Sequence, residues 1–91
     1  MAMIAVWLKI DGENLVPALQ EARDKLDSAE GELVLDFSSV RQIDPKALRA
    51  MEEFAGLADD KSVKVSLRGV NVDVYKVLKL VRLAQRFNYL A

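Results

Sequence analysis

Residues 33–51 read LVLDFSSVRQIDPKALRAM, and they predict a buried strand that runs through a short loop into a helix. LVLDF is a short, continuous apolar run of the kind that forms a central strand. SSVRQ is a polar loop, after which Asp44 offers its carboxylate to the free N–H groups of the first helical turn. Pro45 suits the first helical position, where its missing N–H removes no hydrogen bond. This order of elements indicates an α/β fold.

Lys46 does not fit this helix start, because a cation in the first turn opposes the helix dipole by roughly 0.3–1 kcal/mol. Two interpretations stay open. Either the helix tolerates an exposed lysine, or a partner outside the chain uses its charge.

The segments on either side continue the alternation of strands and helices. Strands are predicted for residues 3–10, 33–37 and 63–68, the last exposed on one side, and helices begin after Asn14, Asp44 and Asn71. The last helix is expected to turn four apolar residues inward: Val74, Val77, Leu78 and Val81. Residues 87–90 form either a closing edge strand or a packed tail.

The sequence therefore predicts one domain over residues 1–91, an α/β fold with a small, mostly parallel or mixed sheet of about four strands and three helices packed against it. Three helices are too few to cover both faces of such a sheet, so one face is expected to be thinly covered or to belong to a partner. Trp7, in the first strand, is expected in the core. On the thinly covered face it would instead be an interface anchor.

The chain contains no histidine and no cysteine, which excludes a Ser-His-Asp triad, an imidazole base and a His or Cys metal ligand. Its glycines are isolated and form no phosphate-binding loop. We therefore expect a protein that is not an enzyme and that has no catalytic residues, metal or cofactor. No apolar run reaches the about 18–20 residues of a membrane span, so no membrane insertion is expected. The lack of cysteine fits a cytoplasmic location.

Charge is unevenly distributed along the chain. Residues 1–60 contain 6 Lys and Arg against 13 Asp and Glu, a net of −7, whereas residues 61–91 contain 7 against 1, a net of +6. The last predicted helix carries four cations on one face, which we call the basic stripe: Lys76, Lys79, Arg82 and Arg86. The stripe is either a solvated face or a contact surface for nucleic acid or an acidic partner. No aromatic residues alternate with these cations and the net charge is −1, so nucleic-acid binding is not expected.

The stretch LVLDFSSVRQIDPKALRAMEEFAGLA resembles the core signature of STAS domains, the anti-sigma-factor-antagonist fold. In that family an apolar strand ends in Asp-Leu-Ser-x-Val, and Ile-Asp-Ser-Ser-Gly-Leu opens a helix. The later stretch VKVSLRGVNVDVYKVLKLVRLAQRF is similar to the family's strand, glycine turn, final helix and C-terminal phenylalanine. The resemblance covers roughly residues 33–90. The family usually places two strands before its first helix, whereas this sequence predicts one.

The resemblance implies a binding scaffold without the family's phosphorylation switch. In phospho-switched members, the serine two positions after the capping aspartate accepts phosphate from a partner kinase. Here Lys46 occupies that position, Pro45 precedes it, and Ala47 replaces the usual glycine. Lysine is not a substrate for such a kinase, and its positive charge does not mimic phosphoserine.

The resemblance also implies a partner-binding surface of six residues: Ser38, Ser39, Asp44, Pro45, Lys46 and Arg49. Asp44 would order the loop, while Lys46 and Arg49 would supply positive charge for an acidic groove on a partner. The implied partner is a serine-kinase-type anti-sigma factor in a bacterial-style regulatory system. The alternative is the ATPase of a membrane transport complex, on which the chain would dock as an accessory subunit. A homodimer and a modification of Ser38 or Ser39 stay open.

Overall fold

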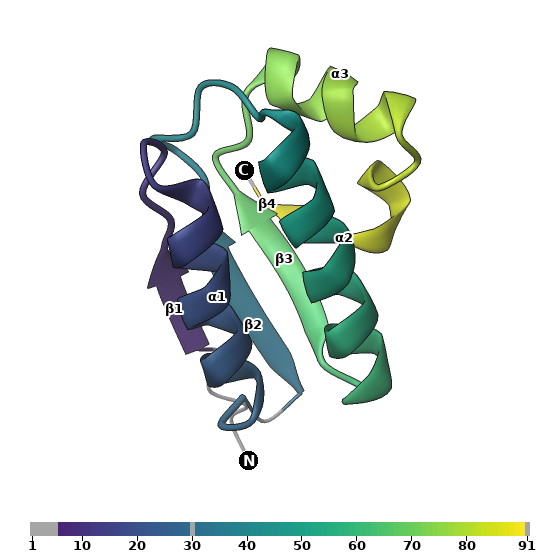
Figure 1. Cartoon of the computed structure of the whole chain (residues 1–91). Coiled ribbons are helices and arrows are strands. Elements are labelled where there is room, and N and C mark those ends of the chain that lie inside the picture. Colours follow the sequence, from purple (N-terminus) through teal and green to yellow (C-terminus); the bar gives the residue numbers. More distant parts are fainter. Residues whose placement is uncertain (1–5, 30, 91) are drawn as a thin grey trace.

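The computed structural model describes residues 6–29 and 31–90. Within them, four strands and three α-helices alternate (Figure 1): β1 (Val6–Lys9), α1 (Leu15–Leu26), β2 (Glu32–Asp36), α2 (Pro45–Asp60), β3 (Lys64–Arg68), α3 (Val72–Leu80), a short 3₁₀ helix η1 (Ala84–Arg86) and β4 (Asn88–Leu90). The predicted order is confirmed, and the last segment is a strand. The start of the first predicted strand, residues 3–5, lies outside the described residues.

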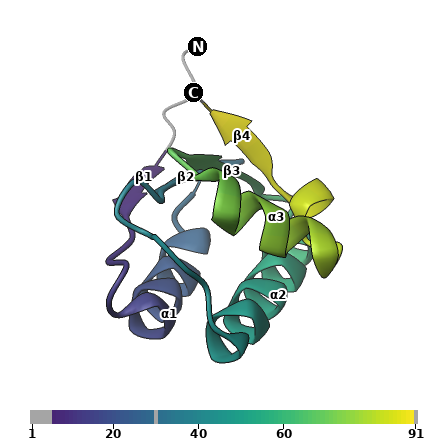
Figure 2. The same ribbon diagram turned by 90° about the horizontal axis from the view of Figure 1, so that it is seen from above.

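The four strands form one sheet in the order β1-β2-β3-β4, and every neighbouring pair is parallel. A helix connects each strand to the next. Because such crossovers are almost always right-handed, three of them in the same direction place all the helices on one face of the sheet. Figure 2 shows this arrangement, with α1, α2 and α3 beneath the sheet. No helix in the described part of the chain covers the other face, as the small number of predicted helices indicated.

The core lies between the sheet and the helices. The strand residues of the core cluster alternate along β2 and β3: they are Leu33, Leu35, Val65 and Leu67. Val34 and Ser66, which lie between them in sequence, are buried as well. The helices contribute the largest set of buried side chains: Leu15, Ala18, Leu19, Ala22, Leu26, Ala47, Met51, Phe54, Ala55, Ala58, Val74 and Leu78. No helix among the described residues is long and apolar enough to cross a bilayer.

The prediction that Trp7 lies in the core is wrong, because its side chain is 56% exposed. Its neighbours Val6 and Leu8 pack against the core, and successive side chains of a strand point to opposite faces. Trp7 therefore lies on the face without helices, which is the alternative for which the sequence predicted an interface anchor. The Arg68 guanidinium carbon lies 5.7 Å from the centre of its ring, a cation–π distance.

The structure corrects three further predictions, on Ser66, on Val81 and on the basic stripe. Ser66, predicted on an exposed face of β3, is only 2% exposed. The final helix ends at Leu80, so Val81 is 47% exposed and not inward-facing. For the same reason the basic stripe is not one helical face: Arg82 follows the helix, and Arg86 belongs to η1.

Both predicted caps are confirmed. The Asp44 carboxylate accepts a hydrogen bond from the Ala47 N–H at 2.8 Å, and the Asn71 side-chain oxygen accepts one from the Val74 N–H at 2.7 Å. Each bond satisfies one of the free N–H groups at the start of its helix. The two caps therefore fix the residues at which α2 and α3 begin.

Gly12 allows two loops to come into contact at the carboxyl ends of β1 and β2. The loop after β1 passes so close to the loop after β2 that a Cβ atom on Gly12 would lie 2.1 Å from the Ser39 carbonyl oxygen. No real Cβ makes such a contact, so only glycine allows this packing. The geometry of the β2–α2 loop thus depends on the residue at position 12.

We expect Gly12→Ala to lower the free energy of unfolding by about 1–3 kcal/mol, because the backbone of one loop must move. The matched control is Gly56→Ala, in the middle of α2, where an added Cβ meets no atom within 4 Å. Alanine there is expected to stabilise the helix by roughly 0.5–1 kcal/mol. Urea unfolding of both variants measures the difference, and an unchanged Gly12→Ala stability would contradict the loop contact.

Candidate functional site

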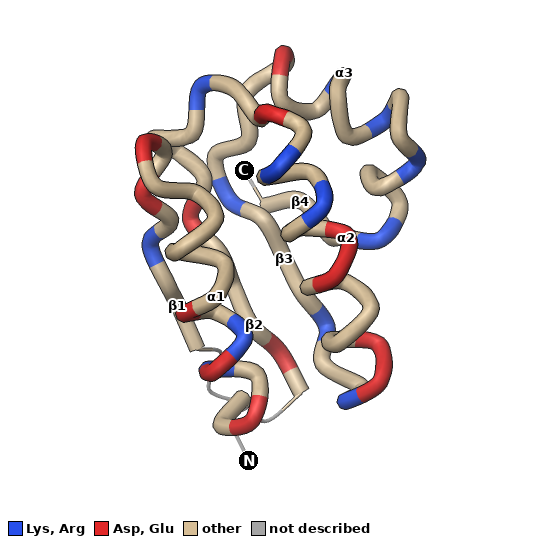
Figure 3. The backbone as a smooth tube through the Cα atoms, in the orientation of Figure 1, with Lys and Arg blue, Asp and Glu red and all other residues tan. Residues whose placement is uncertain are grey.

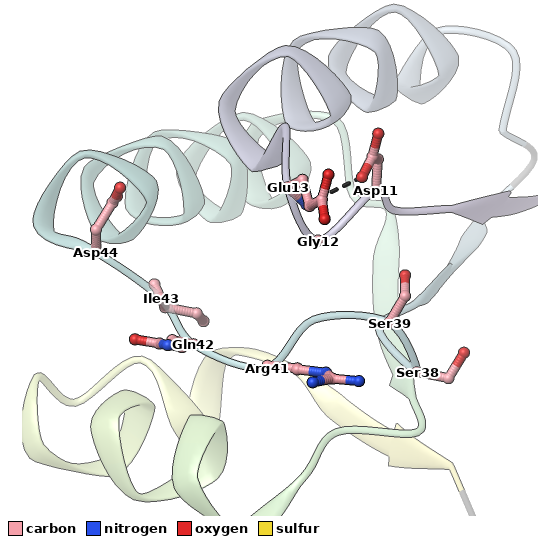
Figure 4. Close-up of a pocket in the computed structure, with 9 residues that line it drawn as sticks. All are labelled: Asp11, Gly12, Glu13, Ser38, Ser39, Arg41, Gln42, Ile43 and Asp44. Atoms are coloured by element: carbon pink, nitrogen blue, oxygen red, sulfur yellow. Dashed lines mark hydrogen bonds between the residues drawn. The ribbon is translucent and has the colours of Figure 1, made fainter.

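A cleft of about 890 Å³, here called the loop cleft, opens where β1 and β2 end (Figure 4). Two loops line it: Asp11, Gly12 and Glu13 follow β1, and Ser38, Ser39, Arg41, Gln42, Ile43 and Asp44 follow β2. Parallel α/β sheets commonly bind ligands at the carboxyl ends of their strands, because every loop that follows a strand gathers there. Three of the predicted surface residues, Ser38, Ser39 and Asp44, lie in this cleft.

The two serines are exposed but already make contacts within the fold. The Ser39 hydroxyl donates a hydrogen bond to the Ile10 carbonyl oxygen at 3.0 Å, and the Ser38 N–H donates one to the Asp36 carboxylate at 2.9 Å. Ser39 thus joins the β2–α2 loop to the end of β1. Ser38 keeps its loop tied to the last residue of β2.

Asp36 is held in its charged form. Hydrogen bonds from the Ser38 hydroxyl and backbone N–H lower the pKa of Asp36 below its ordinary value of 3.8, and the positive charges of Arg68 and Lys9 lower it further. Both cations lie opposite Asp36 on the neighbouring strands.

The lining of the loop cleft is more acidic than the predicted surface residues alone. Asp11 and Glu13 belong to it, and neither was among the predicted surface residues. The Glu13 N–H at 2.9 Å and the Asn14 side-chain amide at 3.1 Å donate hydrogen bonds to Asp11 and lower its pKa. Arg41 is the one cation among the lining residues. The position of Asp11 and Glu13 directly after β1 could have placed them in this cleft from the sequence. Neighbouring parallel strands bring the loops that follow them together.

Lys46 and Arg49 lie outside the loop cleft. They line a smaller hollow of about 160 Å³ between α1 and α2, here called the basic groove, together with Arg23. Pro45 is exposed at the start of α2 and lines neither hollow. Figure 3 shows the cations at the start of α2. The structure therefore divides the predicted surface into an acidic cleft and a basic groove that meet where α2 begins.

The cations of the basic groove have no ion-pair partner in the described part of the chain. The ion pairs found there join Lys61 to Asp27 and Arg86 to Asp59, at other places in the fold. Glu53 also lines the groove but lies in neither pair. The sequence did not predict that Arg23 belongs to this surface, because no local pattern indicates which residues of two helices will come into contact.

Asn71 connects this region to α3. Besides capping the helix, its side-chain amide donates hydrogen bonds to the Val40 carbonyl at 3.1 Å and the Arg41 carbonyl at 3.3 Å. One side chain therefore holds the β2–α2 loop against the start of α3. The sequence predicted the cap but not this second role, which depends on residues about thirty positions away.

A family model described as "Mlab, STAS domain" matches residues 5–90. The chain belongs to the STAS domain family. The match extends the resemblance found from the sequence, which covered roughly residues 33–90, to nearly the whole chain. STAS domains generally mediate protein–protein interactions and are generally not enzymes, so the chain is a regulatory protein-interaction module in that general sense.

A solved structure shares the fold. The protein titled "NMR Structure of the protein TM1081" aligns with a TM-score of 0.76 and 18% sequence identity, over 99% of this chain and 76% of that one. At that identity the likeness concerns the fold alone. A search of curated protein sequences finds no match. Among residues 6–29 and 31–90, no group of three or more His, Cys, Asp or Glu side chains is placed to hold a metal ion.

Asn71→Asp separates the two roles of this residue. Aspartate keeps the oxygen that caps α3 but loses both donors to the loop carbonyls, so we expect the free energy of unfolding to fall by about 1–2 kcal/mol. Asn88→Asp, on exposed β4, is the matched control and is expected to change it by less than about 0.5 kcal/mol. Urea unfolding measures both. Equal stability of the two variants would contradict the loop contact.

The lowered pKa values of Asp36 and Asp11 predict how stability depends on pH. A carboxylate with a folded pKa below its unfolded value stabilises the fold above about pH 4, and this stabilisation is lost as pH falls through the folded pKa. The urea midpoint is therefore expected to fall below about pH 4. Asp36→Asn is expected to make that fall shallower. The same slope in wild type and variant would show that the Ser38 hydrogen bonds do not hold the carboxylate charged.

Proposed function

We propose that the chain is a non-enzymatic regulatory module that binds a partner protein through the surface around the start of α2. This surface combines the predicted residues with one that the fold adds: Ser38, Ser39, Asp44, Pro45, Lys46, Arg49 and Arg23. The observation that carries the proposal is the basic groove, where Arg23, Lys46 and Arg49 gather between two helices without an ion-pair partner among the described residues.

Placing Arg23, Lys46 and Arg49 close together raises the free energy of the folded protein. Lys46 follows Pro45 in the first turn of α2, where no acidic residue offsets it and where the helix dipole opposes its charge by roughly 0.3–1 kcal/mol. Lys46 and Arg49 are also three positions apart, which makes them neighbours on the helix surface. A carboxylate from a partner, placed in the groove, would neutralise both unfavourable terms. The local energetics therefore support an acidic residue on the partner at this point.

The adjoining loop cleft has the opposite sign, since Asp11, Glu13 and Asp44 line it with only Arg41 as a cation. A partner that covers the start of α2 would meet a basic groove on one side and an acidic cleft on the other. Complementary charges arranged in this way fix the orientation of a complex more than its affinity. The pair of hollows thus supports recognition of one specific docking geometry.

The family resemblance points to a serine-kinase-type anti-sigma factor as the partner, bound without phosphorylation at this helix start. A second candidate is the ATPase of a membrane transport complex, on which the chain would dock as an accessory subunit. The observation that favours this candidate is Lys46 itself, which stands where phospho-switched relatives carry serine and so suits a docking role without a phosphorylation cycle. Either role would place the chain in a bacterial cytoplasm.

Lys46→Glu tests the surface. We expect capture of the partner from the native host's lysate to fall by about tenfold, because a carboxylate would now face the partner's acidic residue. The same change is expected to stabilise α2 by about 0.3–1 kcal/mol, since an anion in the first turn favours the helix dipole. Weaker capture by a more stable protein separates a binding effect from a folding effect.

Lys76→Glu, on α3, is the matched control, and mass spectrometry identifies what each protein captures. A kinase-like anti-sigma factor or a transport ATPase, captured by wild type and Lys76→Glu but not by Lys46→Glu, would support the proposal and choose between the candidates. Equal capture by all three proteins would move the interface away from the start of α2. A shift of several degrees in the melting temperature on addition of ATP or GTP would reopen a nucleotide-binding function.

A further inference from the structure

Figure 2 shows α3 and β4 at the far edge of the sheet from α1. Apolar side chains of these two elements form an exposed surface. Its exposed side chains are Val72 at 67%, Tyr75 at 40%, Tyr89 at 38% and Leu90 at 39%. Large apolar side chains gathered on a surface are a common mark of an interaction site. We call this surface, with the two hollows described next, the edge groove.

The two hollows of the edge groove lie on either side of a tyrosine pair. One, of about 370 Å³, is lined mainly by apolar residues that include Val72 and Leu90, and the other, of about 430 Å³, includes Lys79 and Arg82. Both share Tyr75 and Tyr89, whose rings meet edge to face with centres 5.3 Å apart. The Tyr89 hydroxyl donates a hydrogen bond to the Ala84 carbonyl at 2.7 Å. The pair is thus a fixed ridge, which suits an interface better than mobile side chains do.

The charged side chains that line the two hollows, Lys79 and Arg82, are both basic. Asp73 is the last acidic residue of the sequence, so every charged side chain after it is basic. Within the basic stripe, Arg86 is held by Asp59 at 2.6 Å, whereas Lys79 and Arg82 line the groove. Figure 3 shows these cations along α3 and the segment that follows it. The matching occupant carries negative charge together with apolar side chains.

Arg82 has a backbone conformation that favours glycine. Its φ is 62°, and it follows the last turn of α3 in the hydrogen-bonding pattern that usually contains glycine at this point. The Arg82 N–H donates to the Lys79 carbonyl at 3.2 Å, and the Leu83 N–H donates to the Leu78 carbonyl at 2.8 Å. An arginine here costs stability relative to glycine. Arg82 nevertheless lines the edge groove, which indicates a use for its charge.

The outer edge of β4 adds a further means of binding. β4 pairs with β3 on one side, and no described strand pairs with its other side. Its three residues are exposed, so backbone N–H and C=O groups are available to an extended segment.

From these observations we infer that the edge groove binds an extended, acidic segment of a partner protein, with apolar side chains seated on either side of the Tyr75–Tyr89 ridge and carboxylates beside Lys79 and Arg82. A second copy of this chain fits less well, because a symmetric pair through β4 would bring two basic stripes together. Nucleic acid fits less well too, because it would leave the apolar hollow lined by Val72 and Leu90 without a matching group. This surface is separate from the start of α2, so one chain can hold two partner segments at once.

Peptide titration of the isotope-labelled full chain, followed by backbone amide NMR, tests the inference. The probes are three peptides of equal length that alternate Glu with Leu, Glu with Ser, and Lys with Leu, together with a short DNA duplex. We expect saturable shifts only with the Glu–Leu peptide, and we expect them in α3, η1 and β4. Raising the salt concentration is expected to weaken this binding, because the carboxylates contact exposed cations.

Arg82→Gly and Ser62→Gly form a matched pair. Ser62 also has a positive φ, of 56°, and ends α2 through the same pair of hydrogen bonds, but it lies outside the residues that line the edge groove. Both variants are expected to melt at the wild-type temperature or higher. Arg82→Gly alone is expected to bind the Glu–Leu peptide several-fold more weakly. Lys79→Glu, which leaves the backbone of the helix end unchanged, is expected to weaken binding further.

Several results would overturn the inference. Equal binding of the Glu–Ser and Glu–Leu peptides would make the surface a plain anion site, and tight binding of DNA with the same shifts would make it a nucleic-acid site. Shifts centred on the start of α2, or no saturable shifts with any probe, would remove the edge groove as a binding surface. Equal weakening by Arg82→Gly and Ser62→Gly would assign the effect to the helix ends. None of these results depends on the Lys46→Glu experiment, so the two proposals stand or fall separately.

Discussion

The right-handed crossover between parallel strands is the constraint on which the rest of this structure depends. Three successive crossovers in one direction place α1, α2 and α3 on the same face of the sheet and leave the other face without a helix among the described residues. The same connectivity places every loop that follows a strand at the carboxyl ends of the strands, where the loop cleft forms. It also brings α1 and α2 together, which creates the basic groove between them. The last strand added in this order is β4, whose outer edge has no described neighbour.

Two cations in this protein occupy positions where local energetics favour another residue. Lys46 lies in the first turn of α2 against the helix dipole, and Arg82 has a backbone conformation that favours glycine. Each lines a hollow on the surface, and neither takes part in an ion pair among the described residues. Most residues of a small domain agree with both the local and the global structure, and exceptions concentrate where binding requires them. The two proposed surfaces both contain such an exception.

The interior of the protein is simpler than its surfaces. The core is formed by alternate strand residues and by one face of each helix, and no buried side-chain polar atom in the described residues lacks a hydrogen-bond partner. Such a core tolerates variation as long as its pattern and volume are kept. This is consistent with a shared fold at 18% identity to a solved structure. The two proposed surfaces accordingly lie on loops, helix ends and a strand edge that this core positions.

The sequence by itself determined the order of the elements, the two helix caps and the family, because these depend on periodicity, turn residues and motifs that lie within a few positions of one another. Asp44 and Asn71 were predictable as caps since each bonds an N–H three residues ahead. Only the tertiary structure decided that Trp7 faces away from the helices, that Arg23 joins Lys46 and Arg49, and that the basic stripe divides at Leu80. The physical reason is the distance along the sequence over which each interaction acts. Local hydrogen bonds and periodicity are set by neighbouring residues, whereas burial and the meeting of distant charges are set by how the helices cross and pack on the sheet.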